Sequence, residues 1–233
     1  MTTPAAVGLC AGVVFDLDGV LVESEHLWEE SWTALAATSG YAWGHDDTAA
    51  CQGMSVPEWS RYMAARMGGE PGAIAGDVID RMIAALDAGR IELLGGAAPM
   101  VLAAAARAPI AVASSAPKRL IEAVLTATGL RAAFTAVVSS EEVARGKPSP
   151  DVYAEAARRI GRDPARCAAV EDSSNGIRAA AAAGMLVIAI PNPVYPPRPD
   201  ALALCAKIAS SADDARRFLL ERLPDPEPED PMR

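Results

Sequence analysis

Short apolar runs recur along the chain, and most are followed by a stretch whose apolar positions have helical spacing. The runs are Gly12–Phe15, Ile110–Ala113, Ala136–Val138, Ala168–Val170 and Leu186–Ile190. Runs this short, without alternating polar residues, are typical of strands buried on both faces of a parallel sheet. Strand and helix patterns alternate from residue 110 to 190, which predicts an open, doubly wound α/β sheet.

Three helices are expected between these strands, over Pro117–Thr128, Pro150–Ile160 and Asn175–Ala183. Proline loses no hydrogen bond at the first helical position, so we expect Pro117 and Pro150 to begin their helices. Glycine is favoured just past the end of a helix. Each of the three helices is followed by one, at Gly129, Gly161 and Gly184.

The segment from residue 25 to about 90 has a different pattern, because it contains no β-branched run. Its amphipathic stretches are His26–Thr38, Pro57–Met67 and Ile74–Leu86. Glycine-rich breaks separate them, which predicts a small all-helical insertion between the first strand and the rest of the sheet. Residues 224–233 combine prolines with acidic residues and predict a disordered tail.

Composition narrows the class of protein. The 233 residues are 51% hydrophobic and carry a formal charge of −9, which argues against sequence-independent binding of nucleic acid. The four cysteines form no CxxC pair and only two histidines are present, so a structural zinc site is not expected. Without a basic N-terminal leader or a long apolar run, we expect no membrane partner and a cytoplasmic location. We expect a monomer or weak dimer.

Two carboxylates, Asp16 and Asp18, follow the first apolar run directly. Residues i and i+2 of a strand lie on the same face, so both can reach one small volume. Two like charges placed there require a cation or a shared proton. Turn chemistry accounts for Asp18 before Gly19, but it leaves Asp16 at the end of a buried strand unexplained.

Polar residues also follow other predicted strands. Ser114 and Ser115 end the strand at residue 110 beside a helix start, which suits a phosphate, although an ordinary helix cap is an alternative. Glu171 and Asp172 end the strand at residue 168, where acids also suit a helix N-terminus. Lys147 suits a solvated loop, but it is one of only three lysines in an arginine-rich chain, which favours a need for a compact ammonium there.

Together these segments resemble the motifs of the haloacid dehalogenase superfamily, in its helical-cap phosphatase and β-phosphoglucomutase-like subgroup. The matching stretches are Phe15–Leu21, Val112–Ser115, Gly146–Asp151 and Val170–Gly176. The resemblance implies a Rossmann-like catalytic core, residues 1–22 and 92–223, with a helical cap over residues 23–91. It also implies hydrolysis of a small phosphorylated metabolite through an aspartyl phosphate.

The resemblance assigns roles to residues one by one. Asp16 resembles the nucleophile, and Asp18 the general acid that later activates water. Phosphate binding falls to Ser114, Ser115 and Lys147. Mg²⁺ would be held by Asp16, Asp172 and the backbone carbonyl of Asp18, with Glu171 as a further ligand or a partner of the ligands.

Charge supports a cation independently of the resemblance. Bringing a phosphate dianion to within about 4 Å of one carboxylate costs roughly 8 kcal/mol at an effective dielectric near 20. Lys147 and a divalent ion would offset most of that cost. Oxygen ligands with few histidines favour Mg²⁺ over zinc.

Two alternatives to a phosphatase remain open. One is a sugar-phosphate mutase like β-phosphoglucomutase, which the absence of lysine before Lys118 weakens. The other is a non-catalytic phosphate-binding protein, against which the Asp16 and Asp18 pair argues. All four tryptophans lie in the helical insertion, either as its own core or with one or two facing a substrate: Trp28, Trp32, Trp43 and Trp59. Candidate polar contacts there are Glu23, His26 and Arg61.

Overall fold

A computed structural model describes residues 10–51 and 53–225 of the chain. Within that part, six strands form one parallel sheet in the order β5-β4-β1-β6-β7-β8. Strand β1, first in the sequence, lies between β4 and β6, so the chain winds outward in both directions as predicted. The strands are β1 Gly12–Phe15, β4 Ile110–Ser114, β5 Ala136–Ser139, β6 Cys167–Glu171, β7 Leu186–Ala189 and β8 Lys207–Ile208.

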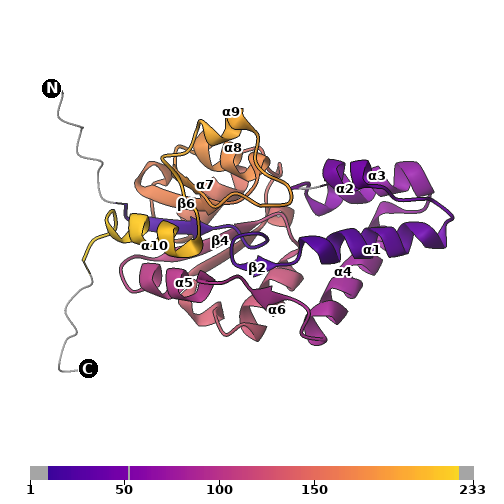
Figure 1. Cartoon of the computed structure of the whole chain (residues 1–233), viewed down its shortest axis with the longest axis horizontal. Helices are drawn as coiled ribbons and strands as arrows, with labels where there is room; N and C mark the ends of the chain where they lie inside the picture. Colours follow the sequence, from indigo (N-terminus) through magenta and orange to yellow (C-terminus); the bar gives the residue numbers. More distant parts are fainter. Residues whose placement is uncertain (1–9, 52, 226–233) are drawn as a thin grey trace.

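Helices cover both faces of this sheet (Figure 1). Because side chains alternate along a strand, Val13 and Phe15 belong to one apolar cluster, and Val14 between them belongs to the other. The first cluster is covered by α5 (Ala97–Ala105), α6 (Lys118–Ala127) and α10 (Ala212–Leu220). The second is covered by α7 (Asp151–Arg159), α8 (Ser174–Ala182) and the short α9 (Pro199–Leu202).

The glycines predicted to follow these helices are confirmed, but each predicted first and last residue differs from the observed one by a single position. Gly129, Gly161 and Gly184 follow α6, α7 and α8 with φ of 73°, 67° and 85°, the left-handed conformation that ends a helix. Pro117 and Pro150 precede the first helical residue instead of occupying it. Pro117 is extended, and its carbonyl accepts the amides of Leu120 and Ile121, so it caps α6.

Between two short strands the chain forms four helices, which lie at one end of the molecule (Figure 1). Strands β2 (Val22–Glu23) and β3 (Glu92–Leu93) pair antiparallel, so the chain leaves and re-enters the α/β part side by side. We propose this two-stranded ladder as the boundary between core and cap. The cap helices are α1 (Glu25–Thr38), α2 (His45–Cys51), α3 (Val56–Met67) and α4 (Pro71–Asp87).

The sequence predicted three of these four helices. Helix α2, with the sequence HDDTAAC, is too short and polar to show an apolar period. In the described part of the chain, no helix is both long and apolar enough to cross a bilayer. The tail predicted over residues 224–233 lies outside the described residues apart from Pro224 and Asp225.

Candidate active site

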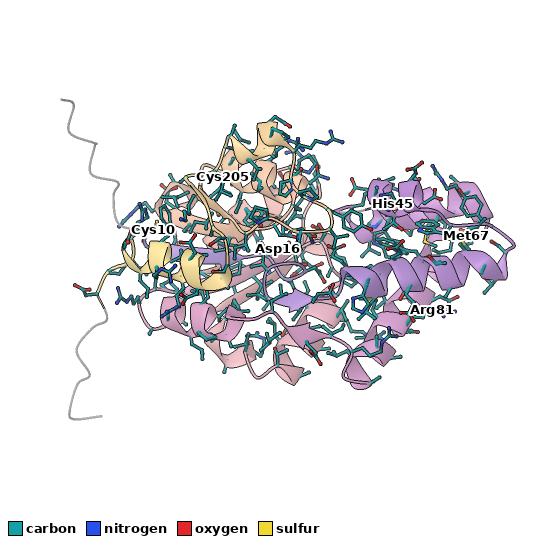
Figure 2. The ribbon with its side chains drawn as sticks, viewed as in Figure 1. Cys10, Asp16, His45, Met67, Arg81 and Cys205 are labelled. Atoms are coloured by element: carbon teal, nitrogen blue, oxygen red, sulfur yellow. The ribbon has the colours of Figure 1, made fainter. Side chains whose placement is uncertain are left out.

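The carboxyl end of β1 places Asp16 at the centre of the sheet edge that faces the cap (Figure 2). Its backbone amide donates to the carbonyl of Val170 at 3.0 Å, which continues the pairing of β1 with β6. The chain then turns at Gly19, whose φ is 76°. A Cβ at Gly19 would lie 2.0 Å from Oδ2 of Asp172, so only glycine lets the Asp172 carboxylate sit against this turn.

Lys147 joins the carboxylates of two strands. Its ammonium Nζ lies 2.9 Å from Oδ1 of Asp16, after β1, and 2.7 Å from Oε1 of Glu171, at the end of β6. All three side chains are buried, and Lys147 is only 4% exposed. Tyr153 of α7 donates its hydroxyl to the same Glu171 oxygen at 2.8 Å. The loop lysine is therefore fixed in position beside Asp16.

Glu171 is engaged at both oxygens. Its Oε2 accepts the backbone amides of Asp172 and Ser173 at 2.9 and 3.0 Å, and the Ser173 hydroxyl at 3.0 Å. A Cβ at Gly176 would lie 1.5 Å from Oε1, so α8 can pass over Glu171 only with glycine there. The N-cap of α8 is Ser173, whose hydroxyl accepts the amide of Gly176, so Glu171 and Asp172 do not cap the helix themselves.

The single ammonium leaves part of the negative charge uncompensated. Burial raises the pKa of Glu171, but Lys147 and the hydrogen bonds from Ser173 and Tyr153 together bring it below the usual range. Burial raises the pKa of Asp16, and Lys147 offsets this only in part. Burial also raises the pKa of Asp172, and the Glu171 and Asp16 carboxylates add to the effect. Ionising both aspartates at neutral pH therefore calls for a further cation.

The donor set fits such a cation. Asp16, Glu171 and Asp172 each offer a carboxylate oxygen, and these oxygens lie within 4.8 Å of one another. Hard oxygen ligands of this kind suit Mg²⁺. The Asp18 side chain lies outside this group. Its Oδ1 accepts the hydroxyl of Ser24 and, at 3.4 Å, the indole N–H of Trp28.

A pocket of about 360 Å³ opens over these groups, between the sheet edge and the cap. Ser114 and Ser115 line it. Ser114 is buried and accepts the amide of Ala116 at 3.0 Å, while Ser115 donates to the carbonyl of Gly53 across the pocket at 3.3 Å. The residues predicted for catalysis, phosphate binding and metal binding therefore all lie at one edge of the sheet: Asp16, Asp18, Ser114, Ser115, Lys147, Glu171 and Asp172.

The predicted polar contacts from the cap are wrong. His26 pairs with Glu23 at 2.5 Å, and both side chains are about half exposed. Arg61 donates to the carbonyl of Pro57, one helical turn earlier. None of the three lines the pocket. Trp28, Trp32 and Trp59 are buried in the cap and also line the pocket, which is three tryptophans instead of the one or two expected.

Sequence reasoning missed several residues that support the site. Tyr153 stands inside an amphipathic helix, where a buried tyrosine is indistinguishable from core. Asn192 donates to Oδ2 of Asp172 at 3.2 Å from the proline-rich loop after β7. Ser24 lies just ahead of α1, and its hydroxyl donates to Asp18 and makes no capping hydrogen bond to the helix.

Acidic and hydroxyl side chains gathered at the carboxyl edge of an open parallel sheet mark the place where α/β folds bind their ligands. The chain belongs to the haloacid dehalogenase-like hydrolase family, which matches residues 10–184. It is 30% identical to hexitol phosphatase B of Escherichia coli strain K12 over 224 residues, 94% of this chain and 100% of that protein. It is 31% identical to the fructose-1-phosphate phosphatase YqaB of the same strain, over 75% of this chain and 93% of that one. These matches place it in the phosphatase and mutase subgroup.

Solved structures share the fold over most of the chain. CbbY from Rhodobacter sphaeroides, in complex with phosphate, superimposes with a TM-score of 0.77 at 27% identity, over 88% of this chain and 95% of that one. β-Phosphoglucomutase from Clostridium difficile has a TM-score of 0.79 at 20% identity, over 92% and 97%. The latter likeness shows the fold alone.

Proposed function

We propose that this chain is a Mg²⁺-dependent phosphatase that hydrolyses a small phosphorylated metabolite through phosphorylated Asp16. The observation that carries the proposal is the placement of Asp16, buried at the end of β1 and 2.9 Å from the Lys147 ammonium. A carboxylate held beside an ammonium and a pocket is equipped to attack an anionic substrate. A binding protein has no use for such a nucleophile.

Relatives suggest the class of substrate. By their names, two relatives act on hexitol phosphates and on fructose 1-phosphate. Another structure of CbbY holds xylulose-1,5-bisphosphate. We therefore propose that the substrate of this chain is a small phosphorylated sugar or polyol. The pocket of about 360 Å³ is of a size for such a molecule.

In the proposed reaction, Lys147 and Ser114 bind the phosphoryl oxygens and orient phosphorus toward Asp16. An Asp16 oxygen forms a bond to phosphorus while the ester P–O bond breaks, and Asp18 protonates the departing oxygen. Asp18 then takes a proton from water, whose oxygen attacks phosphorus and releases Asp16 and inorganic phosphate. Asp16, Asp172 and the Asp18 carbonyl would hold Mg²⁺, which offsets the charge gathered on the carboxylates and phosphate.

Substrate and metal dependence are tested together. Phosphorylated hexitols, fructose 1-phosphate, phosphoglycolate and nucleotides are incubated with the protein, and inorganic phosphate is measured. We expect release from at least one sugar or polyol phosphate with Mg²⁺, and loss of that release with a chelator. Release that survives chelation would contradict the metal requirement. An isomerised sugar phosphate without free phosphate would indicate a mutase.

An Asp172→Asn variant should separate stability from activity. Asp172 holds its proton to higher pH when folded than when unfolded, so metal-free wild type loses stability as pH rises through the folded pKa. The variant lacks this loss. In the presence of chelator at about pH 8, we expect the Tm of the variant to be a few degrees above that of wild type. This difference in Tm should close toward about pH 4, where aspartate is also protonated in the unfolded chain.

In the presence of Mg²⁺, the Tm of wild type should exceed that of Asp172→Asn. Mg²⁺ should raise the Tm of wild type but not of Asp172→Asn, and the variant should lose at least about a hundredfold in phosphate release. Asp87→Asn changes an exposed carboxylate and should match wild type within about 0.5 kcal/mol. Equal Mg²⁺ stabilisation of wild type and Asp172→Asn would argue against Asp172 as a ligand.

A further inference from the structure

Tyr195 belongs to the core but contacts the cap. It lies in the loop after β7, and its ring stacks on that of His45, the first residue of α2, with ring centroids 5.8 Å apart and an interplanar angle of 16°. Its hydroxyl donates to Oε2 of Glu29 in α1 at 3.4 Å. Tyr195 also lines the pocket. One core side chain therefore contacts two cap helices at the border of the pocket.

The core fixes the loop that carries Tyr195. Asn192 donates its side-chain amide to Oδ2 of Asp172 at 3.2 Å. The side-chain oxygen of Asn192 accepts the backbone amides of Val194 and Tyr195 at 2.9 and 3.1 Å, a local turn that asparagine favours. The backbone of Tyr195 is thereby tied to a carboxylate of the site, so the ring meets the cap from a defined position.

The stack between Tyr195 and His45 acts on how the cap and the core are placed. His45 is exposed, so the stack adds little to the apolar core of the cap. It can form only while α2 lies against the loop after β7. An aromatic pair changes an equilibrium constant by a factor of about 2 to 10, which is enough to shift an equilibrium between open and closed states.

We propose that Tyr195 is a positioning residue that holds the cap closed over the pocket. In the closed arrangement, Trp28 of the cap donates to Asp18, and cap and core residues both line the pocket. Opening the cap must break the contacts of Tyr195 with both cap helices. Because the closed state is the one able to react, its population scales kcat/KM. Only this kinetic consequence rests on the proposed phosphatase function.

Tryptophan fluorescence reports cap closure without any substrate, because all four tryptophans of the chain lie in the cap. Three of them, Trp28, Trp32 and Trp59, line the pocket and are at most 7% exposed in the closed structure. For Tyr195→Ala we expect acrylamide to quench this fluorescence at least about twofold more efficiently than in wild type. The Tm should stay within about 2 °C, because the changed residue is in a surface loop.

The kinetic effect of Tyr195→Ala should follow the quenching. We expect kcat/KM for the best substrate of wild type to fall about two- to tenfold, in proportion to the closed fraction. A residue with a merely structural role would lower the Tm without changing the quenching of the folded protein.

His45→Ala removes the same stack from the cap side, at a residue outside the pocket lining. It should reproduce most of both effects, and the double variant should add little, because the two changes break one contact. Arg119→Gln is the control. Arg119 pairs with Asp80 of the cap at 2.7 Å, but both side chains are more than 60% exposed, so losing this pair should change neither readout.

Unchanged quenching in Tyr195→Ala would overturn the inference, and so would a fall in kcat/KM that His45→Ala does not share. Either result leaves the phosphatase proposal standing. If wild type releases phosphate from no substrate, the phosphatase proposal fails, and the quenching of Tyr195→Ala and His45→Ala still decides whether Tyr195 holds the cap closed.

Discussion

An Asp16→Asn variant should release phosphate at least about a thousandfold more slowly than wild type while folding normally. An amide is a far weaker nucleophile than a carboxylate, so the variant cannot form the phosphorylated side chain. Asparagine keeps an oxygen that can accept from Lys147, and burial already raises the pKa of Asp16. Removing its charge should therefore leave the Tm equal to or above that of wild type.

The measurement is steady-state phosphate release with thermal unfolding on the same preparations. Asp87→Asn serves as the control for an aspartate changed at an exposed site of the cap. Activity of Asp16→Asn within tenfold of wild type would rule out Asp16 as the nucleophile. Loss of activity together with a large fall in Tm would mean that Asp16 acts mainly through structure.

A Lys147→Met variant should lose both activity and stability. Methionine fills a similar volume but leaves the Asp16 and Glu171 carboxylates buried beside one another without a cation. Breaking a buried ion pair from one side costs about 3–5 kcal/mol, a fall in Tm on the order of 10 °C for a chain of this size. The phosphoryl group also loses its ammonium, so phosphate release should fall at least about a hundredfold.

Two further variants separate these effects. Lys207→Met removes a lysine that pairs with Asp214 at 2.9 Å while 30% exposed, so it should cost under about 1 kcal/mol and no activity. Adding Glu171→Gln to Lys147→Met removes one of the two buried carboxylates that have lost their cation. The double variant should recover part of the lost stability but none of the activity. A Tm for Lys147→Met equal to that of Lys207→Met would show that the buried pair is not coupled to folding.

That the site residues lie close together could be predicted from the sequence, because their proximity follows from sheet geometry. Asp16, Ser114 and Glu171 each stand at the carboxyl end of a buried apolar run, and parallel strands bring those ends to one edge. Lys147 follows no strand directly. Only its rarity and the motif around it pointed to the site, and its contacts with Asp16 and Glu171 depend on the folded loop.

Contacts that depend on tertiary packing could not be predicted. Tyr153 reaches Glu171 from α7, and Trp28 reaches Asp18 from the cap, although the sequence marks both only as apolar positions on helices. The wrong cap assignments have a local cause. Glu23 pairs with His26 three residues later, Arg61 donates to the carbonyl of Pro57 four residues earlier, and both stay outside the pocket lining. The contacts of Tyr195 with the cap are likewise visible only in the structure.

Trapping the covalent intermediate tests the central claim most directly. Wild type is mixed with its best polyol phosphate and Mg²⁺, quenched in acid at successive times within the first turnovers, and reduced with borohydride. Peptide mass spectrometry then locates any reduced side chain. An acyl phosphate on Asp16 should appear as homoserine at position 16, only in samples that received substrate. Normal phosphate release with unmodified Asp16 at every quench time would contradict the account.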